Sequence, residues 1–180
     1  KILPNIKPEW GRISYQIWCA GCSSGEECYT LAMLLQDYKD QGGWLPSFSI
    51  VGTDISEQAL AVAQKGRYPV RELENIPALW QQKYLSMDEA GTSFDIGRAI
   101  REKVRFQRMN LLKPSVGLGQ YDLVLCRNVM IYFNEESRKK LIEKLYRALK
   151  PGGYLFVGHT ELLPRNHELF EYVCPAVYRK

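Results

Sequence analysis

Residues 17–35, IWCAGCSSGEECYTLAMLL, constrain the fold more than any other part of the chain. They begin as a short apolar strand, pass through a turn with Gly21 and Gly25, and continue with leucines at helical spacing. A strand that leads through a glycine turn into a helix is typical of an open parallel sheet, which binds its ligand at such turns. The chain has 180 residues, of which 46% are hydrophobic, and this length suits one core. We therefore expect a single α/β domain over residues 1–180.

Strand and helix patterns alternate along the rest of the chain. Helical patterns are predicted over residues 56–66, where Gly66 ends the helix, and over residues 134–149. Apolar, β-type runs predict further strands over residues 47–54, 103–109, 121–126 and 154–157, and over residues 170–180. This alternation predicts a doubly wound, mostly parallel sheet. Residues 67–102 break the rhythm with scattered prolines and glycines, which indicates an inserted subdomain.

Hydropathy and charge restrict where the protein works. No apolar run approaches the roughly 18 to 20 residues that span a bilayer, and the first twelve residues lack a signal-peptide pattern. We expect a cytoplasmic protein with no membrane insertion. Basic residues exceed acidic ones by 24 − 20 = 4, and residues 98–108, RAIREKVRFQR, hold five of them against Glu102. This stretch indicates an acidic partner, nucleic acid or a solvated charged face, and of these we do not expect nucleic acid.

The pair Cys19 and Cys22 has C-x-x-C spacing, but no second pair of ligands follows at the spacing of a zinc site. We therefore expect no metal. Two readings remain: a redox pair, or two small apolar side chains packed around a cofactor turn.

The turn itself favours one class of cofactor. It lacks the G-x-G-x-x-G pattern, and Glu26 and Glu27 lie at the start of the following helix with no basic residue in the loop. Two carboxylates at a helix N-terminus compete with a pyrophosphate for the positive end of the helix dipole. NAD and nucleoside triphosphates are thus disfavoured, and the cationic S-adenosylmethionine fits better. Either glutamate is equally explained as simple stabilisation of the helix terminus.

Polar residues follow the other strands at the same predicted edge. Asp54 ends the second strand, where a carboxylate reaches the ribose hydroxyls of an adenosine, although Asp54 and Glu57 also match a helix capping box. Asn110 follows the third strand, and Arg127 with Asn128 follows the fourth. These residues are candidates to contact adenine and methionine groups, or are ordinary turn residues.

Six segments together resemble the CheR family, the chemoreceptor glutamate methyltransferases. They are AGCSSGEECYTLAMLL, GTDIS, NLL, LCRNVMIYF, LKPGGYLFVGHTE and the closing VYRK. The resemblance implies a Rossmann-like methyltransferase fold with a seven-stranded, mostly parallel sheet and a small β-subdomain inserted after the second helix. It also implies S-adenosylmethionine as cofactor, S-adenosylhomocysteine as product, and glutamates on the chemoreceptor's cytoplasmic helical bundle as substrates.

Carried over residue by residue, the resemblance implies two sets of functional positions. Tyr132 matches the tyrosine placed beside the transferred methyl group, or is an aromatic side chain packed at the start of a helix. The implied cofactor contacts are Ala20, Gly21, Glu26 or Glu27, Asp54, Asn110, Leu111, Arg127 and Asn128.

Two features depart from the family pattern. Its small N-terminal helical domain and linker arginine have no counterpart in these residues, and the loop SMDEAGTS differs from the glycine-rich loop of members that dock on a receptor tail peptide. The sequence therefore does not predict tail-peptide docking. A second hypothesis follows from the first departure: a module that binds the cofactor but serves as a non-catalytic sensor or docking partner.

Overall fold

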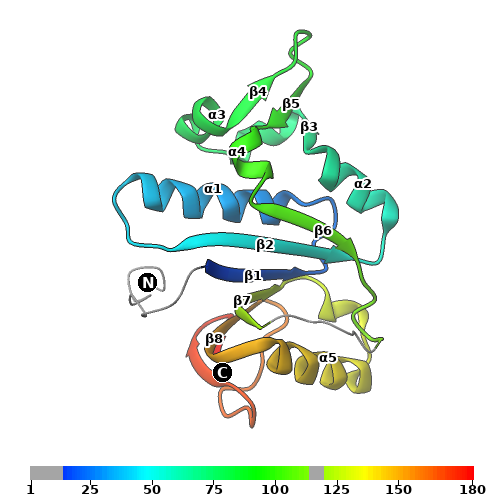
Figure 1. Cartoon of the computed structure of the whole chain (residues 1–180). Coiled ribbons are helices and arrows are strands. Elements are labelled where there is room, and N and C mark those ends of the chain that lie inside the picture. The colour runs from blue at the N-terminus through cyan, green and yellow to red at the C-terminus, as the bar shows by residue number, and fades with distance from the viewer. Residues whose placement is uncertain (1–13, 114–119) are drawn as a thin grey trace.

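The computed structural model describes residues 14–113 and 120–180, so the signal-peptide argument, which concerns the first twelve residues, lies outside the described part. Its centre is a seven-stranded sheet in the order β6-β2-β1-β7-β8-β10-β9 (Figure 1). The pairs β1–β2, β2–β6, β1–β7 and β7–β8 are parallel, and β10 runs antiparallel to β8 and β9. The predicted α/β fold with a mostly parallel sheet is thus confirmed. The strands are β1 (Ser14–Ala20), β2 (Ser47–Asp54), β6 (Val104–Arg108), β7 (Tyr121–Cys126), β8 (Leu149–Val157), β9 (Glu171–Cys174) and β10 (Val177–Arg179).

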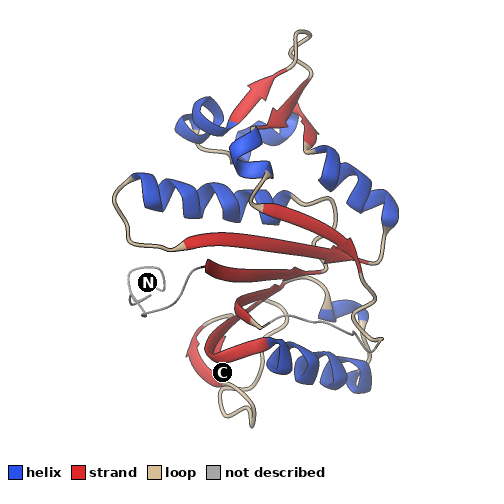
Figure 2. Ribbon diagram, viewed as in Figure 1, coloured by secondary structure: helices blue, strands red, loops and turns tan. Residues whose placement is uncertain are grey.

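Helices cover both faces of this sheet (Figures 1 and 2). Helices α1 (Glu26–Asp40) and α2 (Glu57–Lys65) lie on one side, and α5 (Glu135–Ala148) lies on the other. The side chain of Asn134 accepts the Ser137 N–H at 2.9 Å and so caps α5, a helix predicted to begin at about this residue. Gly66 ends α2 in the left-handed conformation, as predicted.

The central strand β1 shows why the sheet is buried on both sides. Successive side chains of a strand point to opposite faces, so Ile17 and Cys19 join the core under α1, whereas Trp18 and Ala20 join the core under α5. All four are at most 2% exposed. The near-continuous apolar run in the sequence is therefore the signature of a strand covered twice.

The segment between α2 and β6 forms a second, three-stranded antiparallel sheet in the order β3-β5-β4. Figure 2 shows this small sheet and its helices at one end of the molecule, beyond α1. The aromatic side chains of Tyr68 and Phe94 anchor it in the core that also contains α1. Its elements are β3 (Arg67–Pro69), the 3₁₀ helix η2 (Val70–Asn75), α3 (Ala78–Tyr84), β4 (Leu85–Met87), β5 (Ser93–Ile96) and α4 (Arg98–Arg101).

Candidate cofactor site at the carboxyl edge of the sheet

The loop after β1 is fixed against the end of β2. The backbone N–H groups of Gly21 and Cys22 both donate to the carbonyl of Thr53, at 2.8 and 2.9 Å. The Thr53 hydroxyl in turn accepts the indole N–H of Trp18 at 2.9 Å, in a fully buried contact. Gly21 has a φ of +77°, and a Cβ there would lie 2.4 Å from Cγ2 of Val129 in the loop after β7. Only glycine lets these two loops approach so closely.

Asp54 holds the same loop from its other side. One carboxylate oxygen accepts the Ser23 N–H at 2.8 Å, and the other accepts the Ser56 N–H at 2.9 Å. The capping-box alternative is wrong, because the N-cap of α2 is Ser56, whose hydroxyl accepts the Ala59 N–H. Asp54 ends β2 two residues earlier and does not cap the helix, so its carboxylate can face the edge of the sheet. Each carboxylate oxygen has two lone pairs, so each retains one acceptor position for a ligand hydroxyl.

The two glutamates at the start of α1 have different surroundings. Glu27 accepts a hydrogen bond from the Arg127 guanidinium at 2.8 Å, which joins α1 to the loop after β7. Burial raises the pKa of the Glu27 carboxyl, and the neighbouring Arg127 opposes part of that rise. Glu26 instead accepts the Ser24 hydroxyl and lines a separate cavity of about 230 Å³ between α1 and the small sheet. Of the pair, Glu27 therefore faces the loops that carry the other candidate residues.

Asn128 lies in a constrained loop, with a φ of +59° that few residues other than glycine adopt. Its N–H donates to the carboxylate of Glu161 at 2.6 Å, and the same carboxylate accepts the N–H groups of Gly158 at 3.0 Å and Ile131 at 3.2 Å. Glu161 is 1% exposed. A Cβ on Gly158 would lie 2.4 Å from the Oε2 atom of Glu161, so the end of β8 packs tightly against the Glu161 carboxylate.

Glu161 is the residue that sequence reasoning missed. It lies in the quoted motif LKPGGYLFVGHTE, but a glutamate after a strand gives no sign that its carboxylate turns inward to hold another loop. Gly158, three residues earlier, has no room for a side chain because the Glu161 carboxylate fills that space, but only the structure shows this.

Asn110 and Leu111 belong to a segment that crosses from β6 toward α5. The Met109 N–H donates to the Asp54 carbonyl at 2.8 Å, and the Asn110 side chain accepts the Leu112 N–H at 2.9 Å. Leu111 is buried in the same core as Trp18 and Ala20. The crossing therefore brings residues 109–111 beneath the ends of β2 and β1, although β6 itself is at the margin of the sheet.

Tyr132 ends the short 3₁₀ helix η3 (Met130–Tyr132), which Glu161 holds through the N–H of Ile131. The Tyr132 side chain is 80% exposed. The alternative that Tyr132 is an aromatic residue packed at the start of a helix is therefore wrong. An exposed phenol on a loop fixed by a buried carboxylate is available to a second substrate.

The cysteines near the loop are packing residues. Cys19, Cys22 and Cys28 are free and buried. A hydrogen bond with Cys28 and burial raise the pKa of Cys22, while a hydrogen bond with Cys19 is the main cause of the raised pKa of Cys28. Thiols held protonated in this way are poor nucleophiles, so the structure opposes the redox reading of the C-x-x-C pair.

The small sheet also reaches the cofactor loop. The hydroxyl of Tyr68 in β3 donates to the Ser24 carbonyl at 2.7 Å, and the Tyr68 side chain is almost fully buried. Ser24 lies one residue beyond Ser23, whose N–H binds Asp54. The loop is therefore held by a carboxylate on one side and a phenol on the other.

Together, these contacts describe what the edge can bind. It presents the free acceptor positions of Asp54, the charged pair of Glu27 and Arg127, and backbone exposed by Gly21. Paired hydroxyls and a cationic group match this donor and acceptor set, so the residues present fit an adenosine ribose and an ammonium group. Within residues 14–113 and 120–180, no three His, Cys, Asp or Glu side chains are grouped to ligate a metal ion. None of the described helices has the length and apolar character needed to cross a bilayer.

Comparison with solved structures identifies the fold. A SAM-dependent methyltransferase from Methanosarcina mazei superposes with a TM-score of 0.50 at 22% identity, over 87% of this chain and 55% of that chain. PKMT2 from Rickettsia typhi in complex with AdoHcy gives a TM-score of 0.52 at 16% identity, over 86% of this chain and 22% of that chain. The predicted Rossmann-like methyltransferase fold is thus confirmed.

Comparison of sequences identifies the family. A chemotaxis protein methyltransferase of Borreliella burgdorferi is 39% identical over 166 residues, which are 92% of this chain and 58% of that protein. Chemotaxis protein methyltransferase 1 of Pseudomonas aeruginosa is 33% identical, over 99% of this chain and 67% of its own length. The chain thus spans about three fifths of such relatives, and residues 1–178 match the family model described as CheR methyltransferase, SAM binding domain. The chain therefore belongs to the CheR methyltransferase family, and S-adenosylmethionine is the cofactor of the domain it represents.

Proposed function

We propose that this chain binds S-adenosylmethionine at the carboxyl edge of its sheet and transfers the methyl group to glutamate side chains of a chemoreceptor. The observation that carries the proposal is the convergence of Asp54 with the Glu27–Arg127 pair around a glycine loop. The relatives named chemotaxis protein methyltransferases support this substrate class, and they favour an enzyme over a non-catalytic module. The proposed substrate is the cytoplasmic helical bundle of the receptor, which places the reaction in the cytoplasm.

Each candidate residue has a role in this proposal. Asp54 accepts hydrogen bonds from the ribose hydroxyls through its free lone pairs. Glu27 offers negative charge to the cationic methionine end, and Arg127 orients its carboxylate. The remaining contacts are assigned to the backbone of Ala20 and Gly21 and to Asn110, Leu111 and Asn128.

Bound S-adenosylmethionine supplies an electrophilic methyl group on a sulfonium centre. A substrate glutamate has an unperturbed pKa of about 4.3, so it is already a carboxylate at neutral pH and needs no strong base. The protein's contribution is then to position the two groups and to exclude water from between them. Tyr132, exposed at the end of η3, is the residue we assign to orient the incoming carboxylate or the methyl donor.

Two measurements test the proposal in sequence. Calorimetric titration of the chain with S-adenosylhomocysteine is expected to show one binding site, and no binding would refute the cofactor assignment. Transfer of tritiated methyl groups to receptor membranes is then expected, with label released as methanol by base because methyl esters are base-labile.

The two outcomes separate the enzyme from the non-catalytic alternative. We expect label from a fusion that carries the family's N-terminal helical domain. Cofactor binding without any label in that fusion would favour the sensor or docking module, and base-stable label would point to an N-methyl or C-methyl product.

A further inference from the structure

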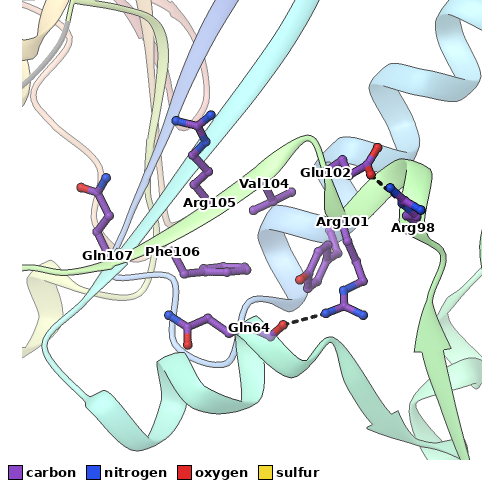
Figure 3. A pocket seen from close by; sticks show the side chains of 9 residues that line it. Gln64, Arg98, Arg101, Glu102, Val104, Arg105, Phe106 and Gln107 are labelled. Atoms are coloured by element: carbon purple, nitrogen blue, oxygen red, sulfur yellow. Dashed lines mark hydrogen bonds and ion pairs between the residues drawn. The ribbon is translucent and has the colours of Figure 1, made fainter.

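A hollow of about 600 Å³ lies along the outer side of β6 (Figure 3). Its floor is aromatic: Tyr29 and Phe106 meet edge to face with ring centroids 5.6 Å apart, and Val104 lies beside them. Figure 3 shows Phe106 and Val104 on one side of the β6 ribbon and Arg105 on the other. Side chains from both faces of the strand therefore line the hollow, which places it along the strand's edge.

That edge is open to another chain. β6 is the terminal strand of the seven-stranded sheet, and among the described residues it pairs with no strand except β2. The outer N–H and C=O groups of an edge strand are a template on which an extended peptide adds as a further strand.

The rim of the hollow carries positive charge that the neighbouring carboxylates do not neutralise. Arg101 donates to the Gln64 carbonyl at 3.1 Å and, within the described part of the chain, forms no ion pair within 4.0 Å, although its charge helps to lower the pKa of Asp95. Arg105 is exposed, and no hydrogen bond or ion pair of its side chain is found among the described residues. The acidic side chains nearby are already paired: Glu57 with Arg108, Asp95 with Arg67, and Glu102 with Arg98.

This pairing refines the role of residues 98–108. The sequence treats the five basic residues alike, but Arg98 and Arg108 are each bonded to a glutamate. The uncompensated charge comes from Arg101 and Arg105, which flank the aromatic floor.

We propose that the β6 hollow is a docking site for an extended acidic peptide of a partner protein, which adds as a strand beside β6. Backbone groups of the peptide pair with the open edge, an apolar side chain covers the half-buried Phe106, and flanking carboxylates bind Arg101 and Arg105. An exposed edge strand, an aromatic floor and two uncompensated arginines in one place support this occupant. None of the residues that line the hollow is among those assigned to the cofactor, so the proposal is tested independently of the proposed catalytic function.

The test uses a fluorescein-labelled ten-residue peptide of alternating Glu and Val, with binding to the chain followed by fluorescence polarisation. We expect the double variant Arg101→Glu and Arg105→Glu to weaken binding at least tenfold. The matched control is Arg71→Glu, an exposed arginine of η2 outside the hollow, which is expected to leave the affinity unchanged. Equal affinity of the parent and the double variant would overturn the proposal.

Two further probes separate strand addition from simple charge attraction. A peptide with the same side chains but N-methylated backbone is expected to bind at least tenfold more weakly, and β6 amides are expected to exchange more slowly with deuterium when the unmodified peptide is bound. Full binding of the N-methylated peptide would overturn strand addition. Tighter binding of a short DNA duplex, lost in the double variant, would assign the surface to nucleic acid instead. Unchanged melting temperature and S-adenosylhomocysteine affinity confirm that the double variant is folded.

Discussion

The guanidinium of Arg127 and the carboxylate of Glu27 are 2.8 Å apart although the two residues are separated by 100 positions in the sequence. The pair joins the first turn of α1 to the loop after β7, and thereby links the two loops that border the cofactor edge. Because Glu27 is largely buried and Arg127 more exposed, the carboxylate bears most of the desolvation.

Glu27→Gln is expected to weaken S-adenosylhomocysteine binding while raising stability at neutral pH. Burial raises the Glu27 pKa above its usual value of 4.5, so the folded state holds this proton more tightly than the unfolded state. That contribution to stability is complete below the usual pKa and is lost as pH rises through the raised value. As the pH rises from about 4 to about 8, the melting temperature should therefore fall less steeply for the variant than for the parent. Glu26→Gln is the control, and an equal loss of ligand affinity in both variants would contradict the assignment to Glu27.

Asp54→Asn is expected to reduce S-adenosylhomocysteine affinity by about 1.5 to 3 kcal/mol, the range for hydrogen bonds to a charged group. The amide also lacks one of the two acceptors that hold Ser23 and Ser56. Ser56→Ala is the matched control: it removes the α2 cap and should lower stability by about 1 kcal/mol with little change in affinity. Calorimetry and thermal melts of both variants measure the two effects. An Asp54→Asn protein that binds normally but melts early would restore a purely structural role.

Glu161→Gln is expected to lower both ligand affinity and methyl transfer. Its carboxylate accepts three backbone N–H groups, and an amide in its place turns a donor toward at least one of them. Asp122→Asn is the control. Asp122 is also a buried carboxylate of the sheet, but it lies at the other end of β7, where it binds Lys150 and the Gln16 N–H. We expect both variants to lose stability and only Glu161→Gln to lose affinity at a temperature where both are folded. The same affinity in the two variants would reduce Glu161 to a structural residue.

Tyr68→Phe is expected to weaken S-adenosylhomocysteine binding several-fold, because it removes the hydrogen bond to the Ser24 carbonyl in the cofactor loop. Tyr29→Phe removes an equivalent bond, from a buried tyrosine hydroxyl to the Ala63 carbonyl at 2.8 Å, without touching that loop. Each change should lower stability by about 0.5 to 1.5 kcal/mol. Titration calorimetry distinguishes them, and a similar affinity loss in both variants would rule out a specific role for Tyr68.

Tyr132→Phe is expected to lower the rate of methyl transfer at least tenfold while leaving stability and S-adenosylhomocysteine affinity unchanged. The side chain is 80% exposed, so loss of its hydroxyl disturbs no buried contact. Initial rates with labelled cofactor and receptor membranes, compared as kcat and KM, provide the measurement. A variant with the parental kcat would remove Tyr132 from the catalytic assignment.

Much of the fold was accessible from local patterns. The order of strands and helices in the main sheet, the start of α5 near residue 134 and the glycine end of α2 at Gly66 all depend on neighbouring residues, and the structure confirms them. The capping box at Asp54, given as the alternative to a ribose contact, is wrong, since Ser56 caps the helix instead.

The contacts that the sequence did not indicate are those made across the sheet. Tyr68 lies in the inserted segment, for which no strand was predicted, and Glu161 reads as an ordinary loop acid, because their partners lie 44 and 33 positions away. Ion pairs were equally hidden in the sequence. Residues 98–108 read as a uniform basic stretch, but in the structure Arg98 pairs with Glu102 and Arg108 pairs with Glu57.

The carboxylate of Glu161 sets an order of events during translation. A nascent chain that has grown as far as Asn128 already contains every residue assigned to the cofactor, but the group that fixes Asn128 is encoded 33 positions later. At roughly 5 to 20 residues per second, a ribosome takes some seconds to cover that stretch. During this interval the left-handed backbone at Asn128 has no carboxylate to hold it, so we expect the complete cofactor edge to form only after Glu161 has been synthesised, and the cofactor to stabilise mainly the finished sheet.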